Sequence, residues 1–158
     1  VIFALVLIAL ASVSYVLAKL GKANRQLVLK SQQIVENKAH VRNVDEDDDL
    51  GKKIIAYMQS EKPYLNPDFS LELLTEALGV NRTYVSSAVG RLAPNFRAFL
   101  NSYRIAEAVS MLKDNPDSKL DDISSICGFS NSRTFYNAFK SYTGLTPSEY
   151  KRSLNLIK

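Results

Sequence analysis

The feature that most constrains the fold is a helix, a glycine turn and a second helix, a pattern that occurs twice. The first copy reads LELLTEAL, GVN and RTYVSSAVGRL, and the second reads KLDDISSIC, GFS and NSRTFYNAFKSY. Apolar residues recur three and four positions apart, as in amphipathic helices, and no segment after Leu50 alternates convincingly like a strand. Gly79 and Gly128 take equivalent places, where a tight turn needs a positive φ. The pattern predicts an all-α fold with helix-turn-helix units at about 70–92 and 119–142.

Each unit carries enough apolar residues to bury a small core. We expect these side chains to face inward: Leu71, Leu74, Leu78, Val85, Val89 and Leu92 in the first unit, and Ile123, Ile126, Phe129, Phe135 and Phe139 in the second. Cys127, the only cysteine, is expected to be a small buried residue there, as free cysteines usually are. Ser70 is a candidate N-cap, and Ser118 with Asp121 has the spacing of a capping box.

A long amphipathic helix is expected to join the two units, over about 95–113. Its apolar stripe contains Phe96, Phe99, Leu100, Tyr103, Ala106 and Leu112. About 19 helical residues span about 28 Å, whereas the major groove of DNA returns every ~34 Å on one side of the duplex. A closing helix follows the second unit, with Thr146 as its cap and Pro147 at its first position.

The second helix of each unit has a polar face rich in hydrogen-bond donors. The residues off the apolar face are Arg82, Thr83, Tyr84, Ser86, Ser87 and Arg91 in the first unit, and Ser130, Asn131, Ser132, Arg133, Tyr136, Asn137 and Lys140 in and just before the second helix of the second unit. Both helices lack acidic residues, which phosphate would repel. Arginine suits guanine, asparagine suits adenine, and the hydroxyl and lysine side chains suit phosphates. These residues are predicted to contact double-stranded DNA; the alternative is an ordinary solvent-facing surface.

Residues 1–18 carry no charge and are mostly aliphatic. Eighteen helical residues measure about 27 Å, close to the ~30 Å hydrocarbon core of a bilayer, so a transmembrane helix is predicted. Lys19, Lys22, Arg25 and Lys30 follow at once, which by the positive-inside rule places the rest of the chain in the cytoplasm. A signal-peptide core and a buried core helix are the two alternatives.

The segment between the apolar stretch and the globular part is expected to connect them. Residues 19–44 carry Leu20, Leu27, Ile34 and Val41 at heptad spacing, which predicts a juxtamembrane helix that either pairs two copies in a homodimer or is a solvated spacer. Residues 45–51 form an acidic linker before a domain at 52–158. A calcium loop is rejected because Leu50 and Ala56 stand where its glycine and glutamate are needed.

Composition narrows the functional classes. The chain has 158 residues and a net charge of +4. It contains one cysteine and one histidine, too few for a typical metal site. Its sequence also contains no phosphate-binding glycine loop and no nucleophile paired with a base. We therefore expect neither an enzyme nor a cofactor. The remaining alternative to DNA binding is a membrane-associated adaptor that uses the same helical faces on a protein partner, with little dependence on salt.

Residues 65–155 resemble the C-terminal DNA-binding domain of AraC/XylS-family transcription regulators. The resemblance lies in LNSYRIAEAVSML and ICGFSNSRTFYNAFKSYTGLTPSEYK, with Ser124 where many members have alanine and Asn137 where many have arginine. It implies sequence-specific promoter binding and contact with RNA polymerase. The order of an apolar segment, a short helical segment and this domain is similar to that of membrane-anchored Bacteroidetes members. That likeness implies a single-pass regulator of the bacterial inner membrane.

Overall fold

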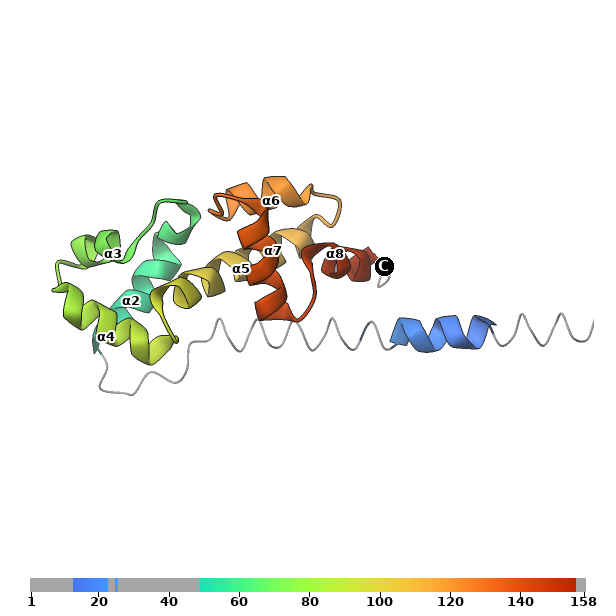
Figure 1. The fold of residues 1–158 in the computed structure, drawn as a ribbon, viewed down its shortest axis with the longest axis horizontal. Helices are drawn as coiled ribbons and strands as arrows, with labels where there is room; N and C mark the ends of the chain where they lie inside the picture. The colour runs from blue at the N-terminus through green and yellow to red at the C-terminus, as the bar shows by residue number, and fades with distance from the viewer. Residues whose placement is uncertain (1–12, 23–24, 26–48, 156–158) are drawn as a thin grey trace, which may run out of the picture.

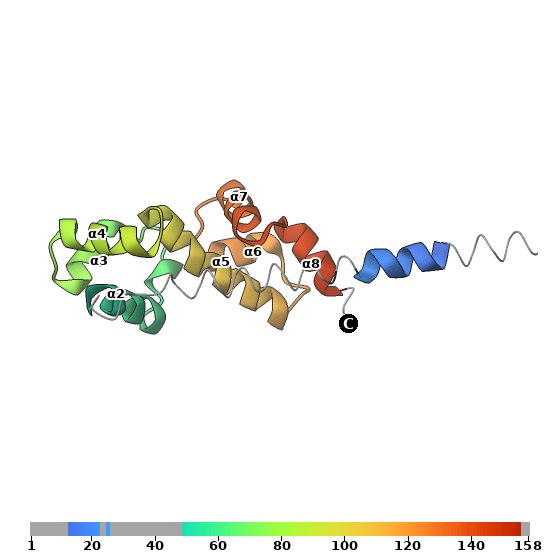
Figure 2. The same ribbon diagram turned by 90° about the horizontal axis from the view of Figure 1, so that it is seen from below.

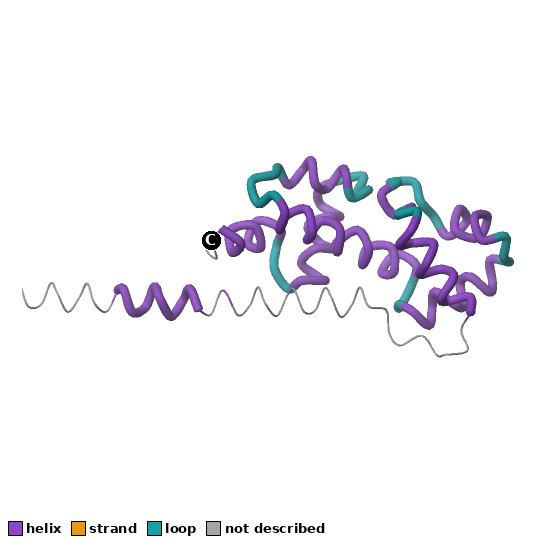
Figure 3. The backbone as a smooth tube through the Cα atoms, turned by 180° about the vertical axis from the view of Figure 1, so that it is seen from behind, coloured by secondary structure: helices purple, strands orange, loops and turns teal. Residues whose placement is uncertain are grey.

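The computed structural model describes residues 13–22, 25 and 49–155. Over this part of the chain every regular element is helical, which confirms the all-α prediction (Figure 1). The elements are α2 (Asp49–Ser60), the short 3-10 helix η1 (Pro63–Leu65), α3 (Leu71–Leu78), α4 (Arg82–Leu92), α5 (Phe96–Asp114), α6 (Leu120–Ile126), α7 (Ser132–Thr143) and α8 (Pro147–Asn155). Short loops connect them (Figure 3). Because α2 begins at Asp49, the last three residues of the predicted linker 45–51 are helical.

The helix α5 runs through the middle of the molecule, with one subdomain at each end (Figure 1). The first subdomain contains α2, η1, α3 and α4, and its core takes Phe99, Leu100 and Tyr103 from α5. The second contains α6, α7 and α8, and its core takes Ile105, Ala108, Val109 and Leu112 from the same helix. One 19-residue helix is therefore part of two hydrophobic cores, and it sets the separation between them.

Side-chain caps set where most of the helices begin. Ser70 Oγ accepts the Leu73 N–H at 3.3 Å, as the sequence predicted, and Asn95 caps α5 through the Ala98 N–H at 2.8 Å. At α8, Thr146 Oγ1 accepts the Glu149 N–H at 3.3 Å, while Glu149 Oε2 accepts the Thr146 N–H at 2.8 Å. This reciprocal pair is a capping box, and it satisfies two N–H groups that a helix start leaves without partners.

Two details of the predicted second unit are wrong. Lys119, not Ser118, is the N-cap of α6 and makes no side-chain cap hydrogen bond, so the expected capping box with Asp121 does not form. Ile126 is 54% exposed rather than inward-facing. The helix ends at Ile126, and the next residue, Cys127, occupies the buried position in the core instead. Phe129, Phe135 and Phe139 are buried there, as predicted.

The predicted membrane segment lies largely outside the described residues. Positions 1–12 of the expected span 1–18, and nearly all of the expected juxtamembrane helix 19–44, are not among them. Residues 13–22 are helical, and their apolar side chains, among them Tyr15 and Leu17, are exposed. Within the ranges that the structure describes, no helix combines the length and apolar character needed to cross a membrane.

Candidate nucleic-acid interface

The two predicted recognition helices lie on one edge of the molecule. Figure 2 shows α4 and α7 along the same edge, whereas α2 lies on the opposite one. The helix α4 packs on α2, α3 and α5, and α7 packs on α5, α6 and α8. Each therefore has an inner side within a core and an outer side toward solvent. This arrangement permits both helices to meet one extended partner at the same time.

The inner sides of α4 and α7 carry the apolar residues that the sequence assigned to the core. Val85, Val89 and Leu92 are buried in the first subdomain, and Phe135 and Phe139 in the second. Phe135 contacts Phe129 and Phe139 edge-on, with ring centroids 5.3 Å and 5.6 Å apart. Such aromatic packing fixes the rotation of α7 about its own axis, and hence which residues it turns outward.

The predicted contact residues lie on the outer sides. Of the thirteen, twelve are exposed: Arg82, Thr83, Tyr84, Ser86, Ser87, Arg91, Ser130, Asn131, Ser132, Arg133, Asn137 and Lys140. Tyr136 is half-buried, and its hydroxyl lies 3.3 Å from Ser148 Oγ of α8. Its hydroxyl therefore links α7 to α8. Arg82, Thr83, Ser86 and Ser87 line a shallow hollow on α4.

Both helices begin with an asparagine cap, of which only Asn131 was predicted to have a role, as a contact residue. Asn81 Oδ1 accepts the Thr83 N–H at 2.9 Å, and Asn131 Oδ1 accepts the Thr134 N–H at 2.8 Å. The side-chain oxygen of Asn131, Oδ1, thus already accepts a hydrogen bond from the helix. A contact between Asn131 and a base would therefore use the NH₂ group of its side-chain amide. The caps fix the exact start of each helix, and recognition helices contact base edges through their N-terminal residues.

Sequence reasoning missed two carboxylates beside this surface because they belong to the preceding helices. Glu72, the second residue of α3, forms an ion pair with Arg82, the first residue of α4. Asp121, the second residue of α6, accepts a hydrogen bond from Ser132, the first residue of α7, at 2.8 Å. The pKa of the Glu72 carboxyl is lowered. The largest cause is a hydrogen bond from the backbone N–H of Glu72 itself, and the positive charge of Arg82 acts in the same direction. The repeated acid at the second helical position was the available signal.

Two units of this kind, bridged by one helix and exposing polar second helices on one edge, define a helix-turn-helix domain. The family model described as a helix-turn-helix domain (HTH_18) matches residues 74–153, which is half of the chain. The chain belongs to this family. The match supports the AraC/XylS resemblance at the level of the domain. The finer likeness to membrane-anchored Bacteroidetes members stays a prediction.

Known proteins agree with this assignment. The uncharacterized HTH-type transcriptional regulator SAR0107 of Staphylococcus aureus is 28% identical over 127 residues, which cover 80% of this chain and 16% of the relative. The uncharacterized transcriptional regulatory protein YesN of Bacillus subtilis is 26% identical over 108 residues, covering 66% of this chain and 26% of the relative. The chain thus spans only a small part of either relative. The C-terminal domain of AraT, a response regulator from Geobacillus stearothermophilus, shares the fold, with a TM-score of 0.60, 24% identity, and coverage of 69% of this chain and 88% of that one.

Proposed function

We propose that this chain binds double-stranded DNA as the DNA-binding part of a transcription regulator, with α4 and α7 each entering a major groove. The observation that carries the proposal is that both helices, which contain no acidic residue themselves, turn exposed polar faces to the same edge of the molecule. A carboxylate within either face would be repelled by the phosphates that line a groove. Membership of a helix-turn-helix family supports the same function.

The length of α5 suits two grooves of one duplex. Its 19 residues correspond to about 28 Å at 1.5 Å per residue, compared with ~34 Å between successive turns of the major groove. Arg82 and Arg133, each within the first two residues of its helix, are the candidates for reading bases, whereas Lys140 and the hydroxyl residues suit phosphates. Sequence-specific promoter binding and contact with RNA polymerase complete the proposal, on the strength of the AraC/XylS resemblance.

We further propose that residues 1–18 anchor the chain in the bacterial inner membrane, with the DNA-binding domain in the cytoplasm. The support is the uncharged sequence of 1–18 and the cluster of positive charges that follows it. Of this segment, residues 13–18 are helical and keep their apolar side chains exposed, as a lipid-facing helix would. The heptad in 19–44 supports a homodimer, in which two copies would place four recognition helices on DNA.

The test of DNA binding is selection from a pool of duplexes with a random central region, followed by a salt titration on the recovered sequence. The full chain, kept in mild detergent, should recover a two-part motif whose halves lie about one helical turn apart. Its affinity should fall about 10³-fold or more between 50 and 200 mM salt, because bound phosphates release counterions. Recovery of no enriched motif, with weak and salt-independent retention, would refute the proposal.

The test of the anchor is membrane fractionation with an alkaline wash. The full chain should stay with the membranes, and a chain that begins at residue 49 should be released. Release of both chains would disprove the anchor and leave the DNA proposal intact.

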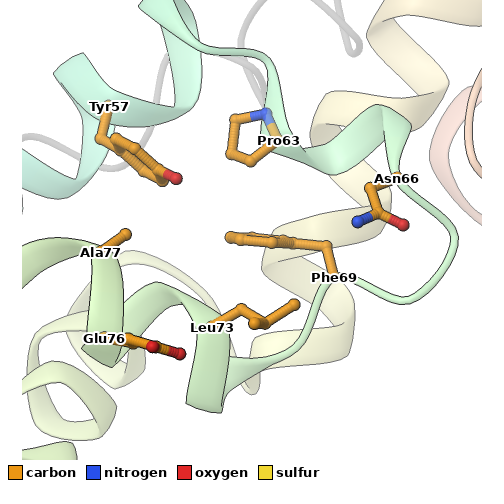
Figure 4. Close-up of a pocket in the computed structure, with 7 residues that line it drawn as sticks. All are labelled: Tyr57, Pro63, Asn66, Phe69, Leu73, Glu76 and Ala77. Atoms are coloured by element: carbon orange, nitrogen blue, oxygen red, sulfur yellow. The ribbon is translucent and has the colours of Figure 1, made fainter.

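A second candidate function is a helical adaptor for a protein partner, which could use the faces of α4 and α7 or a separate groove in the first subdomain. Tyr57, Pro63, Asn66, Phe69, Leu73, Glu76 and Ala77 line this groove between α2, η1 and α3 (Figure 4). Leu73 is 40% exposed there and gives the groove an apolar wall. An adaptor would show binding with little salt dependence and no enriched DNA motif, so the same titration separates the two functions.

A further inference from the structure

Arg104 is a buried arginine at the boundary between the two cores. It is 7% exposed and stands in α5 between Tyr103, which belongs to the first core, and Ile105, which belongs to the second. A buried guanidinium is costly unless its N–H groups are satisfied. The groups that contact the guanidinium therefore indicate its structural role.

The partners of Arg104 come from both subdomains. Its Nε donates to the carbonyl oxygen of Tyr64 at 2.7 Å, and its Nη2 donates to that of Asn66 at 2.8 Å. Both carbonyls belong to the segment around η1 in the first subdomain. The guanidinium also lies over the ring of Phe129, 5.5 Å from its centroid, and Phe129 is in the α6–α7 turn of the second subdomain. One planar group thus holds a loop of one unit beside the turn of the other.

The same turn touches the same loop directly at Gly128. Its φ is +79°, and a Cβ built there would lie 2.6 Å from the carbonyl oxygen of Tyr64 and 2.8 Å from that of Leu65. No side chain fits between the α6–α7 turn and the η1 segment. Because α7 begins four residues after Gly128, this contact sets the position from which the second recognition helix leaves.

Glu107 holds the η1 segment from the next turn of α5. Its carboxylate accepts hydrogen bonds from Lys62 Nζ at 3.1 Å and from the Tyr64 hydroxyl at 3.1 Å. Lys62 has a φ of 47°, so this segment leaves α2 in a strained left-handed conformation that its contacts must maintain. The loop is therefore fixed on α5 by Glu107 and joined to the second subdomain through Arg104 and Gly128.

We propose that Arg104 is a positioning residue that fixes the orientation of α7 relative to α4, so that the two helices fit two grooves of one duplex. The inference rests on the proposed DNA-binding function for its biological meaning, whereas its geometric part stands on the contacts alone. A rigid link makes binding by the second unit nearly intramolecular once the first has bound. Without the fork of Arg104, the two carbonyls of the η1 segment lose their donors and the subdomains pivot about α5.

The geometric test measures the distance between α4 and α7 without DNA. Spin labels are attached to S87C in α4 and S141C in α7, both at exposed positions. Burial raises the pKa of the native Cys127 thiol to about 12, and its side chain is fully buried, so it stays unlabelled. Pulsed electron spin resonance should give one narrow distance distribution for the parent chain and a broadened or shifted one for R104M. The matched control R97M, an exposed arginine of the same helix, should keep the narrow distribution.

The functional test compares affinity for the full selected duplex with affinity for a duplex that keeps only one half of the motif. R104M should lower the full-to-half affinity ratio by about tenfold or more, because the linkage between units is lost. R104K keeps the positive charge but not the two-pronged guanidinium. Its full-to-half affinity ratio should therefore lie between those of R104M and the parent chain. A role in stability alone would leave this ratio unchanged. If R104M does not fold, R104K carries both measurements.

The outcomes separate the two proposals. An unchanged distance distribution together with an unchanged affinity ratio, in variants that melt cooperatively, overturns the role of Arg104. If the parent chain binds no duplex, the proposed function fails, and the distance measurement still decides whether Arg104 fixes the two helices.

Discussion

The two helix-turn-helix units share a backbone plan but differ in what surrounds their turns. Gly79 and Gly128 both adopt a positive φ, of 62° and 79°. A Cβ added at Gly79 would meet nothing within 4 Å, whereas one at Gly128 would overlap the carbonyls of Tyr64 and Leu65. The first glycine therefore serves only its turn. The second also allows its unit to dock on the other subdomain.

The first residues of α4 and α7, the two proposed recognition helices, differ in a related way. Arg82 is paired with Glu72, so a phosphate or base that binds its guanidinium must compete with a carboxylate. Ser132 holds Asp121 instead, and within the described residues its neighbour Arg133 has no ion-pair partner. The hydroxyl of Tyr142, near the end of α7, also donates to the carbonyl oxygen of Ala98 in α5. The second unit thus combines more contacts that fix its position with a more available arginine.

The sharpest way to break this comparison is to add one methyl group to each turn. G128A should lower the free energy of unfolding by about 3–5 kcal/mol, because the strain of a positive φ is joined by overlap with backbone atoms that cannot move aside. G79A should cost about 1 kcal/mol, from the φ alone. Urea unfolding followed by circular dichroism measures both. Equal losses would show that the close approach at Gly128 carries no energy.

The glycine pair also shows what could be predicted from the sequence. Spacing and composition are local properties, so they predicted both units, their turns and the long helix between them. They could not distinguish Gly79 from Gly128, because the difference lies in a contact with a loop more than sixty positions away in the chain. For the same reason Arg104 looked like one more residue of α5, and its burial between two cores was not anticipated.

The errors at the second unit have a local cause. Ile126 follows the buried Ile123 by three positions and Cys127 follows it by four, and both spacings fit one apolar face of a helix. In the structure the helix ends before Cys127, the chain changes direction, and Ile126 remains outside. The pair of Glu72 with Arg82 was not predicted for a different reason, because Glu72 belongs to α3 and is ten positions from Arg82 in the chain. A face free of acids in sequence is not free of them in space when another helix starts beside it.

The next largest effect concerns the two arginines. R133A should weaken binding to the selected duplex by about 1–3 kcal/mol, as expected for an arginine that reads a base. R82A should cost less, because Arg82 gains a DNA contact only by giving up Glu72. Gel-shift titration at constant salt measures both. R152A is the matched control, since it removes one exposed positive charge from α8, outside the predicted contacts.

An equal loss for R82A and R133A would mean that the ion pair with Glu72 does not restrain Arg82. A loss as large for R152A would show that only net charge matters, and neither arginine would then be a specific contact.

A smaller effect comes from the difference in helix caps between the units. Ser70 caps α3, whereas Lys119 at the start of α6 offers no side-chain cap. S70A should destabilise the domain by about 1 kcal/mol, and K119S should stabilise it by about 0.5–1 kcal/mol, because a serine there would accept a helix N–H that no side chain now caps. Thermal unfolding at fixed pH reports both. A destabilising K119S would mean that the backbone at position 119 cannot place a capping side chain.

The smallest expected effect comes from removing the negative charge of Glu72. E72Q should raise affinity for the selected duplex about two- to threefold, because it frees Arg82 and removes a negative charge beside the phosphates. The pKa of Glu72 is lowered, so at neutral pH only the substitution removes this charge. E76Q is the matched control: it removes the same charge one turn later in α3, from a residue that lines the groove beside Tyr57. Equal gains from both variants would reduce the role of Glu72 to net charge. A gain confined to E72Q would show that the ion pair with Glu72 limits the contact of Arg82 with DNA. No ion pair of this kind restrains Arg133 within the described residues.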